Sequence, residues 1–413
     1  MTEKPNYPAI HSWAVYDFAS TVFSMNVISL YFALWVTVDK GGEDILYSSA
    51  LSVSMLAVAL SAPILGAISD QTGRQVRPIA LLSMMCILCT AGLGMVDSLY
   101  AALVLFVFAN YGYQSAMILY NSMLPQVSRG ASPGLVSGYG VAMGYLGSIV
   151  GLLMVKPFVN NGGRSAAFIP TAIMFLVFSL PAFFFIKDAA PNLAVKPGVR
   201  QAFRTLKQTI GEVRAYRNLF HFIMIHFLIL DVVNTAIAFM SIYASKVIGL
   251  DNNQINSFLI TSTVSAMTSA YLIGWLVKRK GAIFSYWLVL WLWAAALAIA
   301  VSSQSQAMFW AVGPLAGMGM GGVWVVSRPL LAELSPPEKV GEFFGLYGLA
   351  GRASSIIGPM LWGTTVFLLE KTGAFKYRAA ISVLLLITLI TLFLFRPLAR
   401  RLSGQPEETT KVT

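Results

Sequence analysis

Four ionisable residues lie inside long apolar stretches of this chain: Asp17, Asp231, Arg328 and Arg352. A charge inside a hydrocarbon layer is costly, so such residues predict a function, for example proton exchange or ligand binding. At ~1.5 Å per residue, Asp231 and Arg352 lie roughly 16 to 18 Å from the ends of their predicted helices, near a membrane midplane. The carboxylate can exchange a proton or meet an ammonium group, and the guanidinium can bind a carboxylate. A purely structural Asp231–Arg352 ion pair is the alternative.

Uncharged polar residues recur at helical spacing around these charges. Asn110, Gln114 and Asn121 share one face of a predicted helix, and each of the two aspartates is followed by polar residues one turn later. Such faces predict the wall of a substrate cavity, with hydrogen bonding between helices as the alternative. We therefore predict these substrate-binding or proton-coupling residues: Asp17, Thr21, Asn110, Gln114, Asn121, Asp231, Asn234, Trp324 and Arg352.

Other chemistries find little support in the sequence. There is no nucleophile–base constellation and no Walker-type phosphate loop, so we expect neither an enzyme nor ATP-driven transport. Cys86 and Cys89 lie one turn apart without neighbouring histidines or carboxylates, which predicts buried thiols. His226 is five residues from Asp231, on another side of the helix, so we expect a core histidine rather than a proton relay. We expect no metal and no cofactor.

The composition indicates the elements that hold these residues. Of 413 residues, 57% are hydrophobic and 11% charged, far from the ~25% charged of a soluble domain. Twelve apolar stretches are long enough, at about 20 residues, to cross a bilayer as helices. They are residues 12–37, 46–69, 78–96, 99–122, 134–157, 166–187, 218–244, 255–277, 282–303, 307–332, 342–367 and 376–397. The predicted fold class is an all-α integral membrane protein.

The second half of the chain echoes the first. The glycine-rich segments 138–151 and 345–358 align at an offset of 207 positions, while Asp17-Phe-Ala-Ser-Thr21 and Asp231-Val-Val-Asn-Thr235 align at 214. A half-chain repeat in an apolar sequence predicts two pseudo-symmetric six-helix bundles with a site at their seam, as in secondary transporters. We expect an N-terminal bundle at 1–187, a linker at 188–217 and a C-terminal bundle with a short tail at 218–413.

The net charge of +11 follows the predicted topology. With the N-terminus inside, about 19 Lys and Arg fall in cytoplasmic segments and about 7 outside, which predicts both termini to be cytoplasmic. The linker repeats apolar residues at helical spacing with arginines between them, and predicts an amphipathic helix on anionic lipids of the inner leaflet. Because the basic residues do not cluster on one face, nucleic-acid binding is not expected.

Between the second and third stretches runs the motif Gly66-x3-Asp70-x2-Gly73-Arg74. Glycine allows a tight turn, and Asp70 can cap the next helix or pair with an arginine. The motif resembles the loop 2–3 signature of the major facilitator superfamily; its second copy, at 274–281, carries Lys278 in place of the acid. The resemblance implies a cytoplasmic gate, and plain helix-end punctuation is the alternative. The predicted gating residues are Asp70, Gly73, Arg74, Arg129, Arg328 and Glu333.

Four further segments resemble the vacuole-effluxer subfamily of major facilitators, which is named for autophagy-linked amino-acid effluxers and has bacterial members. They are Trp13-Ala-Val-Tyr-Asp17-Phe-Ala-Ser, Tyr120-Asn-Ser-Met-Leu-Pro125, Gly144-Tyr-Leu-Gly147, and Ser327-Arg328-Pro-Leu with Gly341-Glu-Phe-Phe-Gly345-Leu-Tyr. The resemblance implies twelve helices in the major facilitator fold and rocker-switch alternating access.

Together these features predict a secondary active transporter, monomeric, in a bacterial-type cell membrane. The resemblance favours an amino acid or similar zwitterion as substrate, and the midplane carboxylates favour proton or other ion coupling. Two alternatives stay open: a transporter of another organic anion or metal chelate, and a non-transporting sensor or assembly scaffold on the same fold.

Overall fold

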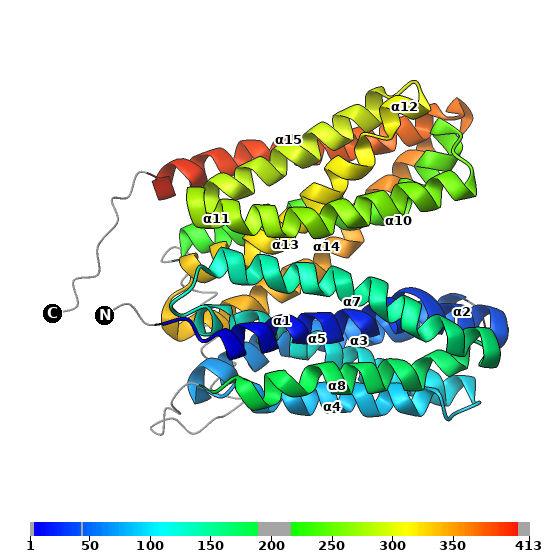
Figure 1. Ribbon diagram of the computed structural model, residues 1–413. Helices are drawn as coiled ribbons and strands as arrows, with labels where there is room; N and C mark the ends of the chain where they lie inside the picture. Colours follow the sequence, from blue (N-terminus) through cyan, green and yellow to red (C-terminus); the bar gives the residue numbers. More distant parts are fainter. Residues whose placement is uncertain (1–3, 43, 189–215, 404–413) are drawn as a thin grey trace. The chain divides into compact units, whose positions relative to one another are not determined.

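The computed structural model describes residues 4–42, 44–188 and 216–403, and throughout these residues the chain is helical apart from short turns (Figure 1). The predicted amphipathic linker helix lies outside the described residues. The predicted all-α class is confirmed.

The first half of the chain holds six long helical segments. The first begins as α1 (Tyr7–Phe23) and continues through π-helical Ser24–Tyr31, α2 (Phe32–Leu34) and π-helical Trp35–Asp39. The others are α3 (Asp44–Thr72), α4 (Val76–Leu93), α5 (Leu99–Ser122) with the short α6 (Leu124–Val127), α7 (Pro133–Gly162), and α8 (Phe168–Phe185) after the 3-10 turn Arg164–Ala167.

The second half begins with α10 (Arg217–Tyr243), extended by π-helical Ala244–Ile248. It continues with α11 (Asn252–Ser302), α12 (Gln306–Phe309), α13 (Val312–Leu334), the 3-10 turn Pro337–Lys339, α14 (Val340–Leu368), the 3-10 turn Glu370–Thr372 and α15 (Phe375–Ser403). Within α11, Gly281 has φ 83° and ψ 164°, which interrupts the helix. The two arms of α11 therefore correspond to two predicted stretches, 255–277 and 282–303.

Ten described helical segments are long and apolar enough to cross a membrane. α11 counts once among them although it has two arms, and α14 contributes the shorter apolar stretch Ile357–Leu368. Each of the twelve predicted stretches therefore coincides with a described helix.

Two compact units emerge from the described residues. One takes in residues from 1–212 together with 335–349, and the other residues from 213–334 together with 350–413. α14 thus begins in the first unit and continues in the second. The predicted boundaries at 187 and 218 stay a prediction.

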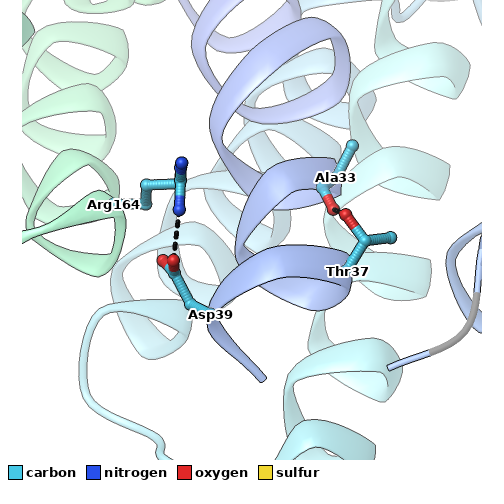
Figure 2. A network of polar contacts seen from close by, with 4 residues as sticks. All are labelled: Ala33, Thr37, Asp39 and Arg164. Atoms are coloured by element: carbon cyan, nitrogen blue, oxygen red, sulfur yellow. Dashed lines mark hydrogen bonds and ion pairs between the residues drawn. The ribbon is translucent and has the colours of Figure 1, made fainter. Parts of the chain in front are cut away.

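Within the first unit, the extension of α1 ends in an ion pair. Asp39 accepts from the guanidinium of Arg164, which precedes α8, and Thr37 one turn earlier donates to the carbonyl of Ala33 at 2.9 Å (Figure 2). The Asp39–Arg164 ion pair therefore joins the end of the first helical segment to the 3-10 turn that precedes α8.

Candidate functional site

The contact between α1 and α7 is built around Asp17. Its side chain is buried, with 5% of its surface exposed, and Thr21 one turn later donates from Oγ1 to the Asp17 main-chain carbonyl at 2.6 Å. Gly144 of α7 lies against both: a Cβ there would be 3.0 Å from Thr21 Oγ1 and 3.6 Å from the Asp17 carboxyl carbon. The two helices, side by side in Figure 1, approach closely at this point because residue 144 has no side chain.

The contact between α10 and α14 is built around Asp231 in the same way. Asp231 is 2% exposed, and Thr235 donates from Oγ1 to its main-chain carbonyl at 2.7 Å. Gly358 of α14 donates its main-chain N–H to Asp231 Oδ1 at 2.7 Å. A Cβ on Gly358 would lie 2.1 Å from Thr235 Oγ1 and 2.8 Å from Asp231 Oδ2, so only glycine fits.

Gly358 is followed by Pro359, inside α14. Proline lacks an N–H and interrupts the hydrogen-bond ladder of a helix. Asp231 therefore accepts the Gly358 N–H at a point where the hydrogen-bond ladder of α14 is already interrupted. A buried carboxylate that holds a main-chain N–H of a second helix couples its own charge to the packing of both helices.

The two halves thus carry one Asp–Thr–Gly cluster each. The first is Asp17, Thr21 and Gly144, and the second is Asp231, Thr235 and Gly358; all three members are displaced by 214 positions.

The alignment of the glycine-rich segments at 207 positions differs in register from these contacts. It paired Gly144 with Gly351, whereas the contacts pair Gly144 with Gly358. In both segments glycines recur seven residues apart, close to two helical turns, so a shift of seven places glycine on nearly the same face. The sequence pattern could not distinguish the two registers.

A third arrangement surrounds Asp70, at the end of α3 in the first unit. Its two carboxylate oxygens accept the main-chain N–H groups of Gly341 and Glu342, at 2.8 Å each. Asp70 therefore caps the N-terminus of α14, where partial positive charge favours an anion. The sequence suggested that Asp70 either caps the next helix or pairs with an arginine. The structure shows a cap, but the capped helix is α14 and not α4, which follows Asp70 in the chain. A Cβ on Gly66 would lie 2.0 Å from the Gly341 carbonyl oxygen, so α3 and α14 approach here through glycine.

Of the five other predicted gating residues, two line a cavity together with Asp70 and three do not. Gly73 and Arg129 line a cavity of about 290 Å³ together with Asp70, and Arg74 is exposed. Arg328 is buried within α13, and Glu333 faces a different cavity, in the second unit.

A family model described as "Vacuole effluxer Atg22 like" matches residues 131–404, more than half of the chain. The chain belongs to this family. It is 25% identical to the "Uncharacterized MFS-type transporter YxiO" of Bacillus subtilis over 97% of this chain and 95% of that protein. It is also similar to autophagy-related protein 22 of Kluyveromyces lactis, at 20% identity over 72% of this chain and 67% of the relative.

Solved structures show the same fold. A bacterial homologue of the iron transporter ferroportin, in the outward-facing state, matches with a TM-score of 0.72 at 17% identity, over 96% of this chain and 99% of that one. The human organic anion transporter MFSD10 matches with a TM-score of 0.75 at 15% identity, over 95% and 100%. The protein is therefore a multi-pass transporter of the major facilitator superfamily, in the Atg22 family, and not an enzyme.

Two segments that carried the resemblance to this family meet in the core of the first unit. Trp13 stacks on Tyr120 with ring centroids 4.4 Å apart; Trp13 Nε1 donates to the Tyr120 carbonyl at 3.1 Å, and the Tyr120 hydroxyl donates to the Trp13 carbonyl at 3.0 Å. This pair fixes α1 against α5 one turn before Asp17. The sequence showed both residues but gave no sign that they meet.

Four other residues were predicted to bind substrate. Three of them make hydrogen bonds to neighbouring residues, and the fourth is half-buried. Asn110 is fully buried and donates to Ser54 Oγ of α3 at 2.7 Å, and Asn234 donates to Ser354 Oγ of α14 at 3.3 Å. Gln114 donates to Asn110 Oδ1 at 3.5 Å, and Trp324 is half-buried. For both asparagines, hydrogen bonding between helices is what the structure shows.

The remaining predictions concern three side chains. Asn121 is half-buried, and its Oδ1 accepts no hydrogen bond from the described residues. His226 is fully buried with Nδ1 3.0 Å from the Tyr286 hydroxyl. The side chain of Arg352 lies outside the described part of the chain, so its pairing with Asp231 stays a prediction.

Proposed function

We propose that this Atg22-family transporter carries an amino acid or a similar zwitterion, coupled to a proton that Asp231 binds and releases. The observation that carries the proposal is the 2.7 Å bond from the Gly358 N–H to the buried Asp231 carboxylate. Burying an ionisable group inside a membrane protein costs free energy, so its presence at a helix contact indicates a function. The resemblance to vacuole effluxers supplies the substrate class.

Protonation of Asp231 changes the packing of α10 on α14. A charged carboxylate accepts a hydrogen bond about twice as strongly as a neutral group. Adding a proton therefore weakens the Asp231–Gly358 bond and loosens the contact beside Pro359. Proton binding thus changes the packing of α10 on α14. A change in helix packing that depends on a bound ion can shift the population between the two states of alternating access.

Arg352 provides the link to substrate in this proposal. It stands six residues before Gly358 on α14, roughly 9 Å along the helix. Arg352 stays charged at all physiological pH and suits a substrate carboxylate. A carboxylate bound there reduces the positive potential at Asp231 and makes its proton easier to keep. Substrate and proton then bind cooperatively.

Two other functions follow from different chemistry. An organic anion or metal chelate would use Arg352 without an ammonium partner, and a sensor or scaffold would use neither charge for turnover. The duplicated Asp–Thr–Gly cluster favours transport, because a scaffold has no need to keep a buried carboxylate in each half.

A thermal-shift screen of the purified full chain tests the substrate class. The panel comprises single amino acids, dicarboxylates and iron citrate. At 100 times its dissociation constant a ligand stabilises the native state by ~2.7 kcal/mol, so an amino acid should raise the melting temperature clearly. The shift should disappear in Arg352→Ala. A shift with iron citrate or dicarboxylates but no amino acid would reject the proposed class.

We further infer that Asp70 acts as a gate residue on the cytoplasmic side of the cell membrane, with both termini inside. Its two bonds to α14 hold the first turn of that helix against α3, and a cap of this kind contributes about 0.5–2 kcal/mol. The Lys and Arg bias supports the orientation. Binding of anionic lipids to the basic linker and a monomeric state belong to the same proposal.

Asp70→Asn should open this gate, since an amide keeps one acceptor oxygen and loses the charge. The reporter is Ser122→Cys, a buried site beside Asp70 in the 290 Å³ cavity, in a chain without Cys86 and Cys89. Labelling by an impermeant thiol reagent in inside-out vesicles should rise about 5- to 30-fold, the range of a ~1–2 kcal/mol shift.

Asp188→Asn is the matched control for this variant. Asp188 Oδ1 accepts the N–H groups of Gln75 and Val76 at 2.7 Å each and so caps α4, leaving α14 untouched. Equal labelling in the two variants would reduce Asp70 to a helix cap, and labelling in intact cells would overturn the orientation.

A further inference from the structure

A second cavity, of about 570 Å³, lies in the second unit at the interruption of α11. Four charged residues line it: Lys280, Glu333, Arg396 and Arg400. Three are cations and one is an acid, so the cavity carries excess positive charge. None of them was assigned to substrate binding, and Glu333 was predicted to be a gate residue.

The fold brings these residues together from three helices. Gly281, with its positive φ, ends the first arm of α11 directly after Lys280. Glu333 is the penultimate residue of α13, and Arg396 and Arg400 are one turn apart on the last turns of α15, hence on one face. Three helix ends thus converge on the cavity, all at the side of the membrane predicted to be cytoplasmic.

An apolar surface continues from the cavity along α11. Phe284 lines the cavity and is 49% exposed, and Leu288 and Trp291 follow at intervals of four and three residues, 36% and 48% exposed. These spacings place the three side chains on one face of the helix.

The same holds on α15, which packs beside α11. Leu389 and Phe393 are exposed and precede Arg396 by two turns and one turn respectively. In a membrane-spanning helix such faces contact acyl chains. Cations at one end and an apolar face at the other match the two parts of a phospholipid, whereas a free anion would need only the first.

We propose that this cavity binds the phosphate headgroup of an anionic phospholipid, whose acyl chains lie along the exposed faces of α11 and α15. Arg396, Arg400 and Lys280 attract the headgroup, and the Glu333 carboxylate opposes it and limits the affinity. The bound lipid joins the ends of α11, α13 and α15. The site is independent of the proposed substrate and of the Asp–Thr–Gly clusters.

Native mass spectrometry of the purified full chain tests the site with phosphatidylglycerol as the probe and phosphatidylcholine as the neutral comparison. Removing a cation near a membrane surface costs about fivefold in lipid affinity. The double variant Arg396→Gln, Arg400→Gln should therefore bind phosphatidylglycerol about 30-fold more weakly, with phosphatidylcholine binding unchanged. Arg279→Gln is the matched control, because Arg279 lies over the Trp275 ring at 4.4 Å and does not line the cavity.

Glu333→Gln separates this site from a merely structural role. Removing the acid should strengthen phosphatidylglycerol binding about fivefold, a gain that a damaged fold would not give. Inorganic phosphate and glycerol 3-phosphate, which lack acyl chains, should not displace the lipid at millimolar concentration. Full retention of phosphatidylglycerol by the double variant, weaker binding in Glu333→Gln, or displacement by inorganic phosphate would each overturn the proposal.

Discussion

Asp231→Asn should abolish accumulation of substrate driven by a proton gradient while leaving exchange of substrate across the membrane nearly intact. The amide has the shape of the protonated acid and still accepts the Gly358 N–H through its carbonyl oxygen, so we expect the fold to persist. It cannot bind or release a proton, so the coupling free energy, ~1–3 kcal/mol or about 5- to 150-fold in accumulation, is lost. The measurement is uptake of the amino acid found by thermal shift, in proteoliposomes, with and without an imposed pH gradient.

Asp17→Asn is the matched variant, because Asp17 occupies the same position in the first cluster. We expect it to retain uphill transport, since Asp17 lies ten residues after the start of α1 and Asp231 lies fourteen residues after the start of α10, nearer the middle of the membrane. Loss of accumulation in Asp17→Asn together with full accumulation in Asp231→Asn would move the proton site to the first half of the chain.

The helices and their membrane class could be predicted from composition and run length alone. Both aspartates of the clusters could also be found, because a charge in an apolar stretch is visible in a single sequence. Their partners could not be found. Gly144 and Gly358 are recognised only by what lies opposite them, and the glycines recurring at seven residues allowed two alignments.

The partner of Asp70 escaped prediction for a different reason. Charge patterning directs attention to basic side chains, whereas Asp70 binds main-chain N–H groups 271 and 272 residues away. Every residue other than proline carries such a donor, so the sequence holds no mark of which one is used. For Asn110 the sequence identified the polar residue but not its partner. Its side chain donates a hydrogen bond to the buried Ser54 on α3.

Gly358→Ala should destabilise the protein and abolish transport, whereas Gly351→Ala should be tolerated. A Cβ at 358 would lie 2.1 Å from Thr235 Oγ1, far inside contact distance, and Thr235 is fully buried with its hydroxyl bonded to the Asp231 carbonyl. Overpacking of this kind typically costs ~1–3 kcal/mol. At Gly351 the nearest atom to a Cβ is Leu230 Cδ1 at 3.4 Å, the far end of a flexible side chain. Thermal unfolding and transport of the two variants give the comparison.

The same pair of variants decides between the two registers of the half-chain repeat. If Gly351 were the counterpart of Gly144, alanine there would disturb the second cluster and alanine at 358 would not. A double variant, Thr235→Ala with Gly358→Ala, removes the closest clash and leaves Asp231 Oδ2 at 2.8 Å as the next, so partial recovery of stability is expected. Recovery of stability without recovery of proton-driven uptake would show that the cluster serves coupling as well as packing, because the added methyl group still separates Asp231 from α14.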